Sequence, residues 1–418
     1  MRRLPATTVY YGLEFVLSMP SYILIAVYLV RDLNLSPLEL ILVGTVMEAT
    51  VFVTEVPTGI LADTYSRRLS LIVSFVIQGA AIVLITSVPH IAVVLLAWGL
   101  WGFGYTFMSG AYEAWITDEV GAENVGPVFM RGNRISYAGA FVGLMLGVTL
   151  ATQSLRGAVI AGGVLTALAG VACIFVMPET GFRRRPVGER GGPFHEFRTT
   201  AVNATRFVRA QPMLLLLIAV AFFAGMSTET FDRLQEAHFI RDIGLPKIGS
   251  LDPVVWFGLF GAGGLLIAFF ASGTLVKRFE HAGIATIVKL LFGLTCVMMI
   301  GQIVFGLAGG IAVAIAAVFA TSLARSLVYP LYMTWLNQQI TDSSIRATVI
   351  SMNGQSDAIG QAGGGPLLGA IGNAWGIRVA LVAGGLVLAP VLALYGRALA
   401  RGGNAPELHE LPEPALQP

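Results

Sequence analysis

Charged residues are scarce in this sequence. Asp, Glu, Lys and Arg make up 12% of the 418 residues, whereas soluble domains carry about 25%. Hydrophobic residues make up 56% of the chain, and the mean hydropathy is +0.77. A soluble protein of this composition could not cover its surface with polar groups. An integral membrane protein can have it, because lipid is the solvent of its outer face.

Cysteine and histidine are also few and the net charge is small. Each of these features argues against a class of function. The two cysteines, Cys173 and Cys296, lie far apart in apolar segments and predict neither a disulfide nor a metal site. The five histidines lack metal-ligand spacing, so we expect no metal and no cofactor. A net charge of +2 is too small to indicate nucleic-acid binding. The absence of a phosphate-binding loop argues against ATP-driven pumping.

Long apolar segments are what the sequence has instead. A membrane-spanning helix needs about 20 mostly apolar residues, and twelve segments meet this requirement. They are residues 7–31, 37–62, 68–88, 90–118, 127–152, 157–177, 212–239, 252–276, 283–306, 309–338, 345–371 and 376–400. We therefore predict an all-α, polytopic membrane protein with twelve transmembrane helices.

The two halves of the chain show a weak internal repeat. YEAW at 112–115 matches YMTW at 332–335, and GAFVGLMLG at 139–147 matches QAGGGPLLG at 361–369. Parallel six-helix repeats are typical of transporters with a central site between two halves. We therefore predict two pseudo-symmetric six-helix bundles. The predicted parts are an N-terminal bundle (1–180), a cytoplasmic linker (181–211), a C-terminal bundle (212–400) and a disordered cytoplasmic tail (401–418).

The distribution of Lys and Arg predicts the orientation in the membrane. With both termini inside, the inner segments hold eighteen of these residues and the outer segments five. Basic residues favour the cytoplasmic side of a membrane protein. We therefore expect a multi-pass protein of the cell membrane with both termini in the cytoplasm.

A short charged turn separates the second and third apolar segments. Its sequence, GILADTYSRR at 59–68, resembles the signature loop of the major facilitator superfamily, Gly-x-Leu-Ala-Asp-Arg-x-Gly-Arg-Arg. The matching positions are Gly59, Leu61, Ala62, Asp63, Arg67 and Arg68. With the twelve helices, the inside termini and the repeat, the resemblance extends over residues 7–400. It implies a transporter, in which this loop closes the inner side by holding the halves together.

The resemblance makes Gly59, Asp63, Arg67 and Arg68 the gate of the predicted transporter. Gly59 would let neighbouring helices approach closely, since it has no side chain. Asp63 would accept hydrogen bonds from Arg67 or Arg68, or face the helix N-terminus predicted at 341–348. The alternative is that this turn only anchors the topology.

Ionisable residues within the apolar segments are the candidates for a substrate or proton site. They are costly in lipid and usually face the bundle interior or a wet cavity. By resemblance, the first, fourth, seventh and tenth helices line the cavity. The candidates on these helices and the eleventh are Glu14, Glu113, Asp232, Arg325 and Asp357.

The candidates are expected to have different roles. Glu14 and Glu113 are the leading proton sites, because a buried carboxyl group without a partner can hold a proton near neutral pH; a structural hydrogen bond is the alternative. Arg325 and Asp357 lie near mid-depth in consecutive helices, so we expect them to pair or to share a network. Trp98 stands near where helix 4 of the family usually carries an arginine linked to proton coupling, so we do not expect coupling through that arginine.

Three other acids are more ambiguous. Glu48 and Glu55 are seven residues apart and share a helix face, and Glu229 has the i,i+4 spacing to pair with Arg233. We favour a structural role for all three acids. Asp232 and Arg233 point about 100° apart, so we expect Asp232 to find its partner on another helix.

Secondary transport by alternating access is the function that we expect, as a member of the drug-efflux-like branch. Export of a small amphiphilic compound, driven by proton entry, is its leading form, and acids among aromatic residues would suit a cation. Metabolite uptake or facilitated diffusion is the alternative within transport. A membrane-embedded enzyme or sensor is the alternative of another class, although we expect no enzymatic activity. The expected partners are a small-molecule substrate, protons and the lipid bilayer, and the expected state is a monomer.

Overall fold

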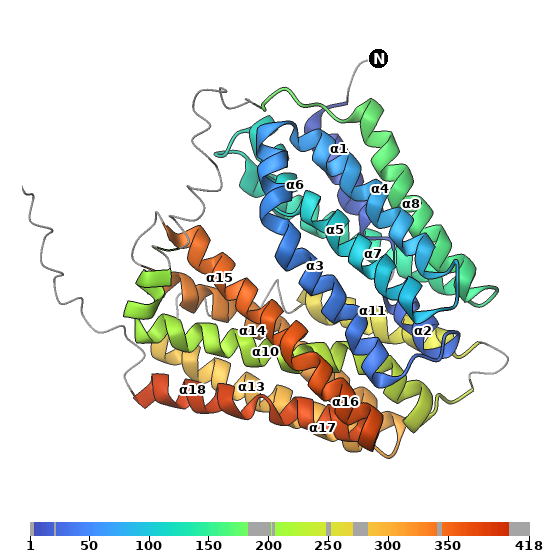
Figure 1. Ribbon diagram of the computed structural model, residues 1–418, viewed down its shortest axis with the longest axis vertical. Coiled ribbons are helices and arrows are strands. Elements are labelled where there is room, and N and C mark those ends of the chain that lie inside the picture. The colour runs from blue at the N-terminus through green and yellow to red at the C-terminus, as the bar shows by residue number, and fades with distance from the viewer. Residues whose placement is uncertain are drawn as a thin grey trace, which may run out of the picture.

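The computed structural model describes residues 4–20, 22–182, 202, 205–247, 252–270, 283–340 and 345–400. Most of the predicted linker, the predicted tail 401–418 and residues 341–344 lie outside this part of the chain. The described residues form helices and no strand. The predicted all-α fold is confirmed, and each predicted span corresponds to one helix or one broken helix (Figure 1).

Eight helices make up the N-terminal half as far as the structure describes it. They are α1 (Ala6–Leu17), α2 (Tyr22–Arg31), α3 (Pro37–Thr64), α4 (Arg67–Ile85), α5 (Ile91–Met108), α6 (Ala111–Val120), α7 (Val125–Ala151) and α8 (Leu155–Val176). Two predicted spans are broken in this half. The first breaks near Pro20, because proline cannot donate a helical hydrogen bond. The fourth breaks at Gly110, whose φ of 72° is a left-handed conformation that suits glycine.

The C-terminal half repeats this pattern with its own interruptions. Its elements are α10 (Pro212–His238), η2 (Phe239–Ile243), α11 (Val254–Phe270), α13 (Ile284–Leu307), α14 (Ile311–Gln339), α15 (Arg346–Ile359), η5 (Gly360–Gly364), α16 (Gly365–Trp375), α17 (Ile377–Leu386) and α18 (Ala389–Ala400). The π-helical turn η2 follows α10 at the end of the seventh span, and η5 interrupts the eleventh span. Such turns occur often at functional sites. A turn at residues 387–388 separates α17 from α18 within the twelfth span.

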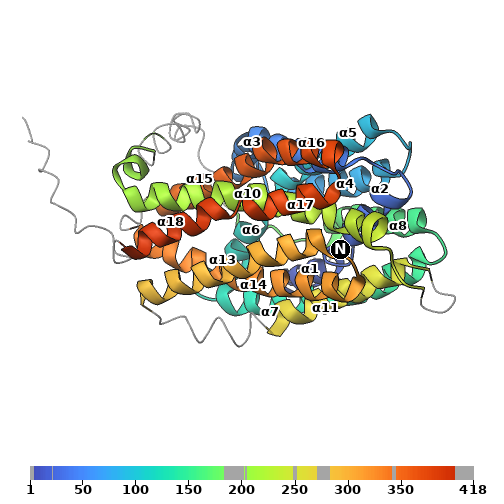
Figure 2. The same cartoon turned by 90° about the horizontal axis from the view of Figure 1, so that it is seen from below.

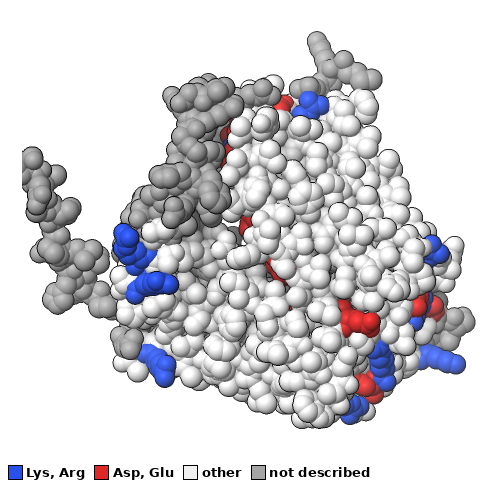
Figure 3. Space-filling view, viewed as in Figure 1, with Lys and Arg blue, Asp and Glu red and all other residues white. Residues whose placement is uncertain are grey.

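Ten helical segments in the described part of the chain are long and apolar enough to cross a membrane. The other two predicted spans are α11, whose apolar stretch Val254–Ile267 is shorter, and the more polar run α15–η5–α16. The side of the molecule seen in Figure 3 has a broad uncharged middle, with charged residues gathered at its ends and a few acidic atoms in a crevice between the halves. This is the surface expected of a protein embedded in lipid.

The hydrophobic core shows how the two halves are joined. One cluster of buried residues contains side chains from both halves, among them Leu24 and Phe239. Two further clusters each belong to one half, around Trp115 in the N-terminal half and around Trp335 in the C-terminal half. The halves therefore share a core at one end, here named the closed end, and have separate cores at the other, the open end. In Figure 1 the closed end lies at the lower right, where α2 of the N-terminal half contacts α11 of the C-terminal half.

Hydrogen bonds reinforce the contact between the halves at the closed end. The guanidinium of Arg241, in η2, donates to the carbonyl oxygen of Leu35 at 2.8 Å and to the side-chain oxygen of Asn34 at 3.1 Å. Arg31 binds Asp252 across the same junction, with an Nη1–Oδ1 distance of 3.2 Å. Figure 2 shows the molecule from below, and in this view the helices of both halves run roughly side by side. The closed end is therefore sealed by polar contacts above a common apolar core.

Candidate transport site

The predicted gate lies in the turn between α3 and α4, at the open end. The guanidinium of Arg67 reaches Asp63 at 3.3 Å, donates to the carbonyl oxygen of Ala114 at 2.9 Å and also binds Asp118. The backbone N–H of Arg68 donates to Glu179 at 2.9 Å. The predicted bond between Asp63 and Arg67 is thus present, and it lies within the N-terminal half.

The expected close approach at Gly59 is wrong for this conformation. A Cβ atom on Gly59 would meet nothing within 4 Å, because the helix ends are apart at the open end. The side chain of Asp63 is 63% exposed. Within the described residues, neither a hydrogen bond nor an ion pair connects Asp63 to α15, and residues 341–344 of the predicted partner lie outside them. The gate role of Gly59, Asp63, Arg67 and Arg68 stays a prediction.

A cavity between the two halves forms the centre of the molecule. Its chamber near the open end, the acidic chamber, has a volume of about 480 Å³ and lies between α3, α5 and α15. Its lining includes Glu48, Glu55, Trp101, Tyr105, Asp357 and Gln361. A second chamber of about 470 Å³, the closed-end chamber, is lined in part by Trp98, Glu229, Asp232, Arg233, Glu236 and Gln361.

The third chamber lies within the C-terminal half and has a volume of about 350 Å³. This C-terminal chamber has aromatic and polar walls that include Arg325, Tyr329, Tyr332, Asn353, Asp357 and Gln361. Gln361, in the π-helical turn η5, lines all three chambers. The chambers therefore meet at this residue.

Arg325 forms its ion pair with Asp232. Its Nη1 lies 2.6 Å from Oδ1 of the carboxylate, and its Nη2 lies 2.8 Å from Oδ2. The carboxylate of Asp357 instead accepts a hydrogen bond from Gln361 at 2.7 Å. A direct pair between Arg325 and Asp357 is therefore wrong, because Asp232 on α10 occupies both donors of the guanidinium fork. The two residues still line the same C-terminal chamber. The expectation that Asp232 finds its partner on another helix is met.

Glu229 and Arg233 form the pair expected from their spacing, with an Nε–Oε1 distance of 2.9 Å. Glu229 is only 3% exposed. The guanidinium carbon of Arg233 lies 5.5 Å from the ring centroid of Trp98, on α5 of the other half. The guanidinium of Arg233, on α10 in the seventh span, therefore lies on Trp98, on α5 in the fourth span. Trp98 stands near where the family usually carries an arginine, and the contact crosses between the halves.

Glu14 and Glu113 lie away from these chambers. Glu14 is half-buried, near the hydroxyl groups of Tyr10 and Tyr112 and within electrostatic range of Glu113. Glu113 is exposed, in the first turn of α6 at the open end. The structure brings these two acids near each other, and it places them apart from Asp232, Arg325 and Asp357.

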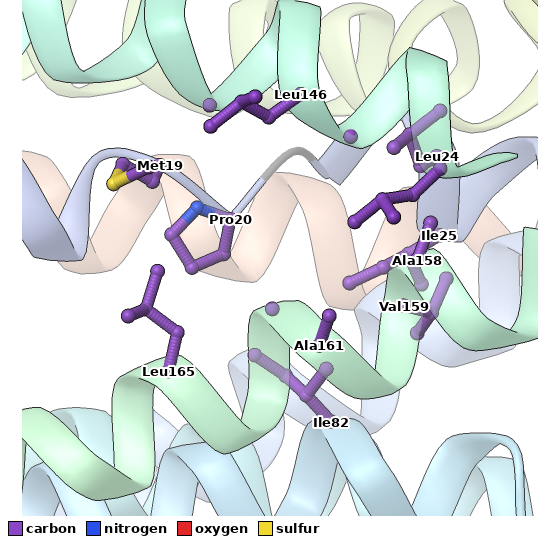
Figure 4. Close-up of a pocket in the computed structure, with 14 residues that line it drawn as sticks. Met19, Pro20, Leu24, Ile25, Ile82, Leu146, Ala158, Val159, Ala161 and Leu165 are labelled. Carbon is purple, nitrogen blue, oxygen red and sulfur yellow. The ribbon is translucent and has the colours of Figure 1, made fainter.

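A further cavity of about 270 Å³ lies between the α1–α2 break, α7 and α8. Figure 4 shows that apolar side chains such as Pro20, Leu24 and Leu165 line it. Its described lining residues include no charged side chain. In the described part of the chain, no group of three or more His, Cys, Asp or Glu could hold a metal ion.

Comparison with known proteins decides the family. The profile of the Major Facilitator Superfamily matches residues 8–340. The chain belongs to the Major Facilitator Superfamily. A curated relative, the uncharacterized MFS-type transporter YxaM of Bacillus subtilis (strain 168), is 23% identical over 361 residues, which are 86% of each chain.

Solved structures of other transporters have the same fold as this superfamily member. A mutant of the nucleoside transporter NupG has a TM-score of 0.76 at 12% identity, covering 94% of this chain and 98% of that one. An inward-facing, unoccupied bacterial homolog of the human lysosomal transporter Spinster has a TM-score of 0.72 at 16% identity, covering 94% and 96%. A POT family transporter in complex with a thioalcohol-conjugated peptide has a TM-score of 0.71 at 13% identity, covering 95% and 96%.

Sequence reasoning undervalued several residues that line the chambers of this superfamily member. Glu48 and Glu55 face the acidic chamber together, as their spacing of seven allows. Glu236 and Gln361 line the closed-end chamber. No local pattern distinguishes Gln361, because its position depends on the π-helical turn that carries it.

Proposed function

We propose that this chain is a secondary transporter that works by alternating access and exports small amphiphilic compounds in exchange for protons. The observation that supports this proposal most directly is the central cavity. At its closed end the halves share one core, and at its open end each half has a separate core. A central site between two six-helix halves can be opened to either side of the membrane by rocking one half against the other. The moving units would be residues 1–180 and 212–400.

The open end is proposed to face the cytoplasm. The inner segments carry the excess of Lys and Arg, and the similar Spinster homolog is described as inward-facing. The protein would then reside in the cell membrane with both termini inside. A site open to the cytoplasm is the loading state of an exporter.

The chamber walls support an amphiphilic substrate and proton coupling. Aromatic rings such as Trp101 and Tyr105 provide apolar contact area, while carboxylates such as Glu48 and Asp357 provide charge and proton acceptors. A second candidate is uptake of a polar metabolite, which is favoured by the nucleoside transporter among the similar structures. No catalytic step is proposed, and the transporter would act as a monomer.

Transport by the purified chain in proteoliposomes tests this proposal. With an imposed pH gradient, acidic on the side to which the closed end faces, a panel of amphiphilic and polar compounds is offered and their accumulation is measured. Gradient-driven accumulation of an amphiphile supports proton-coupled export. Movement of polar metabolites alone would favour the second candidate. If no compound moves faster than in protein-free liposomes, the transport function is wrong.

A further inference from the structure

Among the residues that the structure describes, more carboxylates than cations line the three chambers. Both arginines that line them are already paired, Arg325 with Asp232 and Arg233 with Glu229. The carboxylates without an ion pair to any described residue are Glu48, Glu55, Glu236 and Asp357. Uncompensated charge at this depth in a membrane protein is costly. The cavity is therefore built to receive positive charge.

Hydrogen bonds compensate these four acids only in part. Glu55 accepts one from Ser109 at 3.1 Å, and Asp357 accepts one from Gln361. Glu48 is half-buried and accepts none from the residues that the structure describes. Glu236 is 6% exposed and belongs to the wall of the closed-end chamber, and its Oε2 atom has no hydrogen-bond partner among the described residues. An unpartnered buried carboxylate favours a bound proton or cation.

Aromatic rings stand beside the acids of the acidic chamber. Trp101 and Tyr105 are stacked along α5, with centroids 5.6 Å apart and an interplanar angle of 12°. Tyr22 meets Trp101 edge-on at 5.8 Å. The face of a tryptophan or tyrosine attracts an organic cation, most strongly where water is displaced. Acids and aromatic rings in one chamber favour a cation that is itself partly apolar.

The C-terminal chamber provides room for the apolar part of such a ligand. It meets the acidic chamber at Gly354, Asp357 and Gln361, and its walls include Tyr329 and Val328. The two chambers are adjacent, and a Cβ on Gly354 would meet nothing within 4 Å. The open space beside this glycine could admit an elongated ligand that reaches from one chamber into the other. Arg325, the only arginine among the described residues of its wall, is held by Asp232, so it does not attract an anionic group there.

We propose that the substrate is an organic cation, whose charged group lies among Glu48, Glu55 and Asp357 and whose apolar part enters the C-terminal chamber. This assignment rests on the proposed transport function and specifies its substrate class. Glu48 provides the unpartnered negative charge, and Trp101 provides the aromatic face. Asp357 and Gln361 lie where the two chambers meet and position the ligand between them.

A matched pair of probes tests the assignment with the full chain in lipid nanodiscs. The probes are 4-phenylbutyltrimethylammonium and its neutral isostere, in which carbon replaces the quaternary nitrogen. Calorimetry should show the cation binding at least about tenfold more tightly than the isostere. Glu48→Gln should remove most of this preference, while Glu48→Asp should retain it. Tyr329→Ala should weaken both probes equally, because Tyr329 lines the C-terminal chamber and not the acidic chamber.

Glu123→Gln is the matched control, since Glu123 is exposed in the connection between α6 and α7; it should bind both probes as the parent does. Equal binding of cation and isostere by the parent overturns the assignment. If the parent transports other compounds without this preference, transport stands and the cation assignment fails. If the preference is present and depends on Glu48 but no compound is ever transported, the assignment stands and the transport function fails.

Discussion

Arg325 and Asp232 are joined by two parallel hydrogen bonds, from Nη1 to Oδ1 at 2.6 Å and from Nη2 to Oδ2 at 2.8 Å. This fork geometry is the strongest arrangement of a guanidinium and a carboxylate. It connects α14 to α10 inside the C-terminal half, and both side chains remain nearly half exposed toward the cavity. The pair therefore shapes the cavity wall and leaves Asp357 without an ion-pair partner in the described part of the chain.

Neutralising one member of this pair should be more harmful than neutralising both. Arg325→Gln leaves Asp232 in the cavity wall without its ion-pair partner, and Asp232→Asn does the same to Arg325. The double variant removes both charges, so a double-mutant cycle should give a coupling of about 1 kcal/mol. Thermal unfolding and transport rates of the four proteins measure it. Additive effects would show that the two hydrogen bonds contribute nothing beyond the separate side chains.

Asp63→Asn should reduce transport by about tenfold or more, which corresponds to about 1.4 kcal/mol in gate closure, without changing membrane insertion. Asp63 is 63% exposed here, and such a surface pair contributes about 1 kcal/mol or less to stability. Arg67 also keeps its bonds to Ala114 and Asp118. Vesicle transport and the unfolding temperature separate the two effects. Glu123→Gln is the control at the same end, and unchanged transport by Asp63→Asn would refute the gate role.

The spans were predictable from the sequence because apolar length is a local property, whereas the breaks within them were not. The bend at Gly110 and the π-helical turn at Gly360–Gly364 depend on backbone conformations that the surrounding helices select. For the acids of the site, too, local spacing was predictable and the three-dimensional surroundings were not. Spacing showed that Glu48 and Glu55 share a face, but which cavity that face meets depends on the tilt of α3 between the two halves.

Pairing across helices was the least predictable feature. The expected depth in the membrane, counted from the ends of each span, suggested that Arg325 and Asp357 are neighbours. The guanidinium of Arg325 instead binds Asp232, which lies about 90 residues earlier in the sequence. Depth constrains only one of the three coordinates of a side chain, while helix rotation and position decide the partner. By contrast, the bond between Glu229 and Arg233 was predictable, because one helix fixes both residues.

Glu113→Gln should remove accumulation driven by a pH gradient but spare exchange between equal substrate concentrations. A coupling carboxyl group must load a proton on one side and release it on the other, and exposure at the open end suits release there. Glu14→Gln should do likewise or weaken binding of cationic substrates. Proteoliposome assays with and without the gradient measure both. If both variants concentrate substrate as the parent does, the two acids are structural, and coupling should be sought at Glu229 and Glu236.

Gly44 marks the tightest contact that we find between the halves near the closed-end chamber. A Cβ atom on Gly44 would lie 2.7 Å from Nε and Nη2 of Arg233 and would also clash with Glu229. Glu229 has little room to withdraw, because its side chain is only 3% exposed and is enclosed by neighbouring atoms. The ion pair of α10 therefore fits against α3 only because residue 44 has no side chain.

Gly44→Ala should shift the transporter away from the conformation seen here, by separating α3 from α10 at the closed end. Spin labels at Val88 and Trp375, which are exposed near that end in opposite halves, should show a longer distance component in the variant. Gly12→Ala is the matched control, since a Cβ there meets nothing within 4 Å, and it should leave the distance distribution unchanged. The same shift should slow any transport step that requires the closed end to seal. A Gly44→Ala distribution identical to that of the parent would mean that Glu229 and Arg233 rearrange without moving the helices, and that this contact does not control the closed end.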